Sequence, residues 1–157
     1  MTHRSAVLGI LGLMAGACLL AQAAPASAGL GRAYSSIDTD RLSLGARVTS
    51  AVNTGFTVHT LTLANSGVVK EYTRADGKVF AVTWNAPGRP NLQLLLGDQF
   101  AIMQTEHAVQ AAHHRRRALF VNRSDLVVQS GGHPGAFWGV AVIPQLQPAG
   151  FSAADLK

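Results

Sequence analysis

Three short runs of β-forming residues, joined by tight turns, fill residues 56–84 and restrict the folds open to this 157-residue chain. Residues 56–63 alternate Thr or His with apolar side chains, a pattern typical of a half-buried strand. Residues 68–73 and 78–84 are similar, and Asp76 and Gly77 between them form a strong hairpin signal. We therefore predict an antiparallel meander of three strands.

An amphipathic helix is predicted after this meander. Proline and glycine at positions 87, 88 and 90 end the sheet, and Asn91 is a good N-cap. Apolar residues then recur with the period of one helical face: Leu92, Leu95, Leu96, Phe100 and Met103. The helix is expected over residues 91–115, with a bend available at Gly97, and its apolar stripe should face the sheet.

Further strands are predicted at residues 117–122, 125–129 and 137–143, with a loop at 130–135. Strands followed by a helix and more strands indicate an α+β domain. The expected architecture is a curled antiparallel sheet of five to six strands packed on one central amphipathic helix. A hydrophobic fraction of 48% and a charged fraction of 13% fit one packed domain rather than a disordered chain.

The first 28 residues have the features of a secretory signal peptide. Arg4 supplies a positive start, residues 6–20 are free of charge, and Ala26-Ser27-Ala28 is an A-x-A cleavage site. Cleavage after Ala23 is a second option. The apolar run is shorter than the roughly 20 residues that span a bilayer, so we expect an exported protein of the periplasm or cell surface.

The domain plan follows from this assignment: a signal peptide at 1–28, a flexible lead-in at 29–46, a single domain at 47–150 and a tail at 151–157. A lipoprotein anchored through Cys18 is the alternative. It is disfavoured because Ala15 stands where Leu is usual in the lipidation motif. Cleavage after Ala28 leaves a domain without cysteine, which must fold without disulfides.

The net charge of the chain restricts the kinds of partner that we expect it to bind. Without Arg4 the chain keeps 12 basic and 8 acidic residues, a mild excess. The densest basic patch is Arg115, Arg116 and Arg117, which suits weak contact with an anionic membrane surface, or simply complements the dipole at a helix C-terminus. Aromatic residues make up only 6%, which argues against a stacking platform for single-stranded nucleic acid, and an exported protein is not expected to have a nucleic-acid partner.

Histidine spacing does not predict a metal site. His107 and His113 are six residues apart, and His113 and His114 point in different directions from a helix. His59 and His133 lie in other predicted elements. No phosphate-binding glycine loop, calcium loop or C-x-x-C motif occurs, so we expect neither a metal nor a cofactor.

Ser130, His133 and Asp125 include the residue types of a hydrolase triad. Ser130 is followed by two glycines and does not sit in a G-x-S-x-G elbow, so a wide hairpin loop is the simpler interpretation. A small periplasmic hydrolase using Ser130 and His133 is the alternative function. The preferred function is a non-catalytic binding or assembly-support protein, whose partner is an envelope protein or a small ligand.

Candidate contacts for that partner are Glu71, Tyr72, Trp84 and His133. If Glu71 and Trp84 open onto the same end of the sheet, they form a small polar and aromatic pocket. In the alternative interpretation Trp84 belongs to the core and Glu71 is a solvated strand residue.

Two segments also carry a resemblance. Residues 71–97 read EYTRADGKVFAVTWNAPGRPNLQLLLG, and residues 124–133 read SDLVVQSGGH. Together they resemble a family of small exported proteobacterial proteins catalogued as a domain of unknown function. The likeness extends from about Val48 to Pro148, with departures at residues 85–88 and at Asn91, where the family favours a tighter turn and Asp. The resemblance implies export and a single domain, and it implies no activity.

Overall fold

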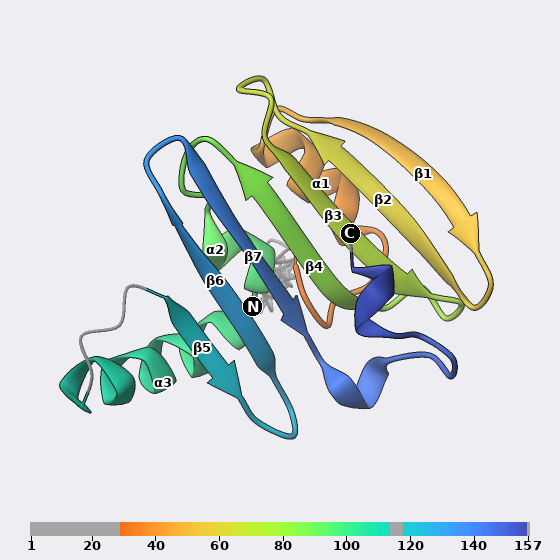
Figure 1. Ribbon diagram of the computed structural model, residues 1–157. Coiled ribbons are helices and arrows are strands. Elements are labelled where there is room, and N and C mark those ends of the chain that lie inside the picture. The colour runs from red at the N-terminus through yellow and green to blue at the C-terminus, as the bar shows by residue number, and fades with distance from the viewer. Residues whose placement is uncertain (1–28, 114–117, 157) are drawn as a thin grey trace, which may run out of the picture.

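A seven-stranded antiparallel sheet forms the body of the molecule (Figure 1). The computed structural model describes residues 29–113 and 118–156. Along the sheet the strands run in the order β1-β2-β3-β4-β7-β6-β5. Their bounds are Arg47–Asn53 (β1), Phe56–Thr62 (β2), Val68–Arg74 (β3), Val79–Ala86 (β4), Leu119–Asn122 (β5), Val127–His133 (β6) and Ala136–Val142 (β7). The predicted α+β class is confirmed, but the sheet has seven strands rather than five to six.

Strand β1 was not predicted as a separate element, yet it pairs with β2 along its whole length. Strand β6 also continues through Gly131 and Gly132, where a loop was predicted. Glycine weakens a strand because it offers no side chain to pack. Here the Trp138 indole of the neighbouring strand covers Gly131, so that a Cβ there would lie 3.1 Å from the ring. The loop is thereby reduced to Pro134 and Gly135.

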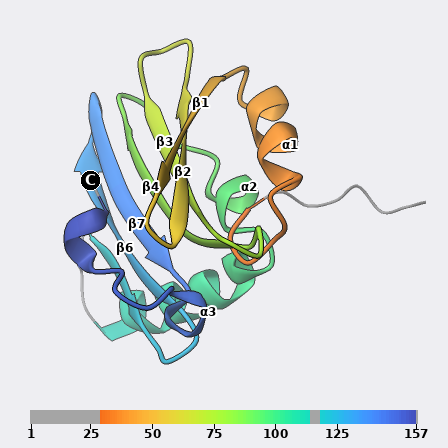
Figure 2. The ribbon, with the colours of Figure 1, turned by 90° about the vertical axis from the view of Figure 1, so that its right-hand side faces the viewer.

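Among the described residues, three α-helices cover one face of the sheet: α1 (Ser36–Ser43), α2 (Leu92–Leu96) and α3 (Gln99–His113) (Figure 2). The single helix predicted after residue 90 is therefore two helices. Gly97 separates them with a φ of 52°, a conformation that glycine adopts without steric cost. Asn91 caps α2 as predicted, since its side-chain oxygen accepts a hydrogen bond from the Leu94 N–H at 3.1 Å.

Residues 29–46, predicted as a flexible lead-in, contribute to the core instead. Leu30 and Ile37 are buried, and the Leu30 N–H donates to the Leu95 carbonyl at 2.9 Å. The next N–H, of Gly31, donates to the Val79 carbonyl at 2.8 Å. Helix α1 lies within this segment. The N-terminal part of the described chain therefore ties α2 to the beginning of β4.

Apolar side chains gather on both faces of the sheet. The larger cluster lies between the sheet and the helices and includes Leu95 and Leu96, both fully buried. On the other face Phe151, from the segment predicted as a tail, packs edge-on against Phe80 with ring centroids 4.7 Å apart. No helix among the described residues is long and apolar enough to cross a membrane.

Candidate functional site

A cleft of about 620 Å³ opens between helices α2 and α3 and the sheet, at the end where the β6–β7 hairpin lies. Strands β4 to β7 and the loop before α2 complete its walls, and most of its lining is apolar. The lining residues are Trp84, Arg89, Pro90, Asn91, Leu92, Gln93, Phe100, Met103, Gln104, His107, Ala108, Leu119, Ser130, Gly131, Gly132 and Phe137. A concave, mostly apolar cavity of this size is typical of small-molecule binding sites.

The Trp84 indole contributes to the wall that the sheet provides. The ring lies across Gly139 of β7, where a Cβ would sit 2.1 Å from Cζ2. Only glycine therefore permits this contact. Trp84 is 3% exposed, and its Nε1 is buried without an acceptor in the part of the chain that the structure describes.

Among the described residues that line the cleft, Arg89 is the one with a permanent charge. It is exposed, and its guanidinium carbon lies 5.3 Å from the centre of the Phe137 ring, which is a cation–π geometry. The loop that carries it is held at Pro87, whose carbonyl accepts a hydrogen bond from the Gly135 N–H at 3.0 Å. Pro90 restricts the backbone of Arg89 further.

Among the described residues that line the cleft, the permanent charge is the positive one of Arg89, and no carboxylate is among them. Glu106, next to His107, is paired with Arg123 at 2.9 Å. The electrostatic character of the cleft therefore favours an anion over a cation.

Glu71 lies elsewhere, in a polar cluster enclosed between α1 and the sheet. It is fully buried, as is Asp40 of α1. Burial raises the pKa of Glu71 to about 9, and the neighbouring Asp40 adds to the rise. Burial likewise raises the pKa of Asp40 to about 6. Glu71 is therefore protonated and neutral at pH 7 while Asp40 is ionised.

His59 belongs to the same cluster, directly across the ladder from Glu71. Its Nδ1 lies 2.8 Å from the Ser50 hydroxyl and its Nε2 lies 3.0 Å from the Thr73 hydroxyl. Burial lowers the pKa of His59, which favours the neutral ring. Both ring nitrogens are thus satisfied by hydroxyls. Within the described residues no three histidine, cysteine or acidic side chains gather into a metal site.

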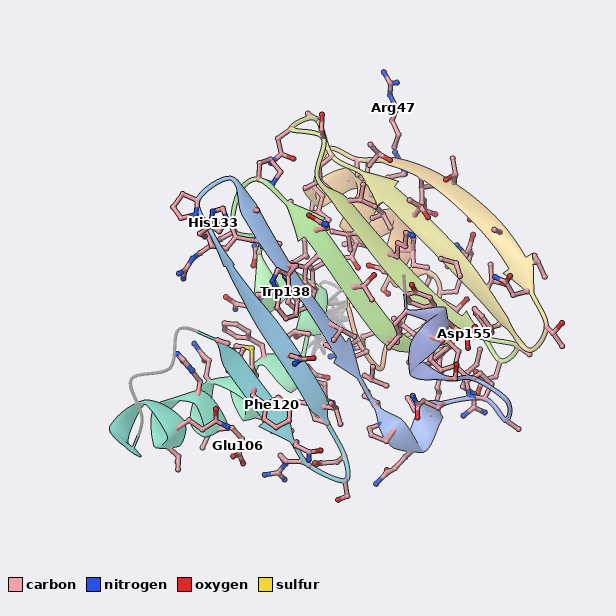
Figure 3. All side chains as sticks on the ribbon, viewed as in Figure 1. Arg47, Glu106, Phe120, His133, Trp138 and Asp155 are labelled. Carbon is pink, nitrogen blue, oxygen red and sulfur yellow. The ribbon has the colours of Figure 1, made fainter. Side chains whose placement is uncertain are left out.

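The structure separates the residues predicted to contact a partner. Tyr72 points to the opposite face from Glu71 and packs near Phe80, with ring centroids 6.3 Å apart. His133 lies at the tip of the β6–β7 hairpin (Figure 3). Of the four candidates, Trp84 alone lines the cleft. The basic patch at Arg115, Arg116 and Arg117 and the predicted signal peptide lie outside the described residues.

The candidate hydrolase residues have separate partners as well. Ser130 lines the cleft, and its hydroxyl donates to the Trp138 carbonyl at 3.0 Å. The Nδ1 of His133 lies 2.9 Å from the Pro134 carbonyl. Asp125 is paired with Arg123 at 2.8 Å, which lowers the pKa of the Asp125 carboxyl.

Sequence reasoning missed Arg89 and Phe137. A signal existed for the arginine, because Arg89 stands between Gly88 and Pro90 just before a helix N-cap, where the loop backbone is restricted. No local pattern, however, indicates that Phe137, nearly fifty residues later, supplies the ring beneath its guanidinium.

Comparison with known proteins places the chain in a family. A family model described as "Protein of unknown function (DUF2844)" matches residues 26–156. The chain belongs to this family. No curated protein and no solved structure shows a significant match.

Proposed function

We propose that this member of the DUF2844 family is an exported, non-catalytic binding protein, and that the cleft between the sheet and helices α2 and α3 is its binding site. The observation that carries the proposal is the cleft itself, which has an apolar interior and a charged arginine among its lining residues. Such a combination suits binding because the apolar part supplies affinity and the polar groups fix orientation.

Two hydrogen bonds favour binding over hydrolysis. A serine nucleophile needs a base within about 3 Å to take its proton. The Ser130 hydroxyl donates instead to the Trp138 backbone carbonyl, and the His133 Nδ1 is turned toward the Pro134 carbonyl. These partners support a structural role for both residues in the β6–β7 hairpin.

Export rests on the sequence of residues 1–28, with Arg4, the uncharged run at 6–20 and the Ala26-Ser27-Ala28 site. A binding protein in the envelope would meet its ligand in the periplasm or at the cell surface. The tests of export and of binding are independent, since the cleft is formed by residues 84–137.

A neutral fluorescent probe tests the cleft. N-Phenyl-1-naphthylamine brightens when it leaves water for an apolar site, so we expect saturable binding to the protein. Ala108→Phe should abolish most of this signal, because Ala108 is an exposed lining residue of α3 and a phenyl group there would occupy the cavity. The matched control is Val109→Phe on the same helix, since Val109 is 54% exposed and is not a lining residue.

The two variants decide the outcome together. Probe binding that survives Val109→Phe but not Ala108→Phe locates the site in the cleft. Equal binding to both variants, or no binding to the parent protein, would reject the cleft as the site. Circular dichroism of each variant verifies that the fold is retained.

A further inference from the structure

We propose that the ligand of the cleft is an anionic amphiphile, namely a hydrocarbon chain that ends in a carboxylate or phosphate group, with the anionic head bound by Arg89. This inference rests on the proposed function and names the class of ligand that the same site would accept.

The interior of the cleft suits a hydrocarbon chain. Leu92, Phe100 and Met103 from the two helices line it, as does Leu119 of β5. The first two are half-buried and retain apolar surface that a ligand can cover. Met103 of α3 and Leu119 of β5 add a flexible and a branched side chain to the lining, and a flexible thioether adapts to chains of different shape. Covering such surface is favourable in proportion to its area.

The arginine among the lining residues suits the head group. A guanidinium presents several N–H donors in a planar fork that matches the oxygens of a carboxylate or phosphate. Stacking on Phe137 orients the Arg89 fork before a ligand arrives, which reduces the ordering cost of binding. Arg89 forms no ion pair with a carboxylate among the described residues, so its guanidinium is available to a ligand.

Neighbouring charges do not compete for this role. The acidic residue of α3 is Glu106, and it is held by Arg123. Asp98, between α2 and α3, is bound by Arg32 at 2.5 Å. A cationic head group would therefore meet Arg89 without a compensating anion, and a neutral head group would leave the guanidinium unused.

A competition experiment tests the inference with four amphiphiles of one chain length, each below its micelle concentration. Dodecanoate and dodecyl phosphate should displace N-phenyl-1-naphthylamine at lower concentration than dodecanol, and dodecyltrimethylammonium should be the weakest competitor. Inorganic phosphate alone should not displace the probe, because it lacks the chain. High salt should narrow the difference between dodecanoate and dodecanol, since an exposed ion pair is screened.

Arg89→Gln isolates the head-group contact. We expect this variant to bind dodecanoate about threefold to tenfold more weakly, the range for loss of one exposed charge-assisted contact, with dodecanol unaffected. The matched control is Arg47→Gln, because Arg47 is exposed on β1, at the opposite edge of the sheet from β5, and projects away from the sheet (Figure 3). That control should bind dodecanoate as the parent protein does.

Tryptophan fluorescence locates the chain. The protein has two tryptophans, and Trp138→Phe leaves Trp84 in the cleft wall as the remaining reporter. Trp138 is 45% exposed and lies on the sheet face away from the helices. A dodecanoate brominated on its chain should quench Trp84 fluorescence in this variant, and excess dodecanoate should restore it.

The outcomes separate the two proposals. Binding of probe and dodecanol with no preference for dodecanoate, or with no effect of Arg89→Gln, would keep the cleft as a binding site and overturn the anionic ligand. Failure of the probe and all four amphiphiles to bind would overturn the proposed function itself. Preference for anions that is lost in Arg89→Gln and retained in Arg47→Gln would support both.

Discussion

Glu71 of β3 and Asp40 of α1 hold their carboxyl groups together in the interior and share one proton at pH 7. If both groups were ionised, none of the four carboxylate oxygens would have a hydrogen-bond donor among the described residues. With one proton, the Glu71 hydroxyl can donate to the Asp40 carboxylate. This contact joins the helix formed by the N-terminal segment to the middle of the meander.

The pair makes stability depend on pH with a definite sign. Folding raises the pKa of Glu71 from 4.5 to about 9, so between these values the native state keeps a proton that the unfolded chain releases. The contribution of Glu71 is therefore fully present below pH 4.5 and is lost as the pH rises toward 9. Asp40 acts in the same direction between 3.8 and about 6.

Glu71→Gln should remove the loss of stability that the parent protein shows as the pH rises. The amide is isosteric, stays neutral and can donate to Asp40, so the variant should gain stability relative to the parent protein as the pH rises from about 6 to about 9. The gain should be at most about 1.4 kcal/mol per pH unit, the value for one proton. Urea unfolding at several pH values measures it. Parallel curves for the two proteins would contradict the buried proton.

The stability of Glu71→Gln must be compared with that of the parent protein at each pH, because His59 also makes stability depend on pH. Because burial lowers its pKa, the stability that His59 contributes is present above its ordinary pKa of 6.5 and is lost as the pH falls below it. This trend opposes that of Glu71 in the parent protein. Glu106→Gln is a suitable control, since Glu106 is a partly exposed residue paired with Arg123, and its curve should follow the parent protein.

Leu95→Ala should destabilise the protein by about 2 to 5 kcal/mol, as expected for a fully buried leucine cut to alanine. Arg116→Ala, outside the described residues, should change the free energy of unfolding by about 0.5 kcal/mol or less if Arg116 lies in the solvated helix end that the sequence predicts. Thermal or urea unfolding compares the two. A Leu95→Ala protein as stable as the parent would mean that α2 does not pack as the structure describes.

Export predicts a specific N-terminus. If Ala26-Ser27-Ala28 is the cleavage site, protein from the envelope fraction should begin at Gly29. N-terminal sequencing and intact mass decide the matter. A start at Ala24 would support the second site after Ala23, and a diacylglyceryl group on Cys18 would establish the lipoprotein alternative. Cytoplasmic protein that retains the initiator methionine would contradict export.

The sequence predicts those parts of the fold whose signals are local. The strands β2, β3 and β4 follow from alternation and from turns such as Asp76–Gly77, because each depends on neighbours in the chain. The Asn91 cap is local too, and it was found. Helix α1 was missed because, among its apolar residues, only Ile37 is buried, while Ser36 and Asp40 fill the remaining buried positions.

The site depends on contacts that no local pattern records. Glu71 looks like a solvated strand residue or a pocket residue in sequence, but it is fully buried and its side chain meets Asp40, thirty-one positions earlier. Strand β6 continues through its glycines because Trp138 covers Gly131 from the next strand. The cleft needs the separation between α3 and the sheet, which the helical period alone cannot supply.

Gly139→Ala should damage the cleft and the fold together. A Cβ at this position would lie 2.1 Å from Trp84 Cζ2 and 2.8 Å from the Gln129 carbonyl oxygen, so the indole must move out of the wall. We expect a loss of about 1 to 3 kcal/mol in the free energy of unfolding, as for other overpacked sites, together with weaker binding of N-phenyl-1-naphthylamine and altered tryptophan emission.

Gly88→Ala is the control, because the nearest atom to a Cβ at Gly88 is Asn65 Nδ2 at 3.8 Å. Its stability, probe binding and emission should stay near those of the parent protein. If Gly139→Ala changed neither stability nor emission, Trp84 could not lie across this glycine, and the wall of the cleft would have to be formed differently.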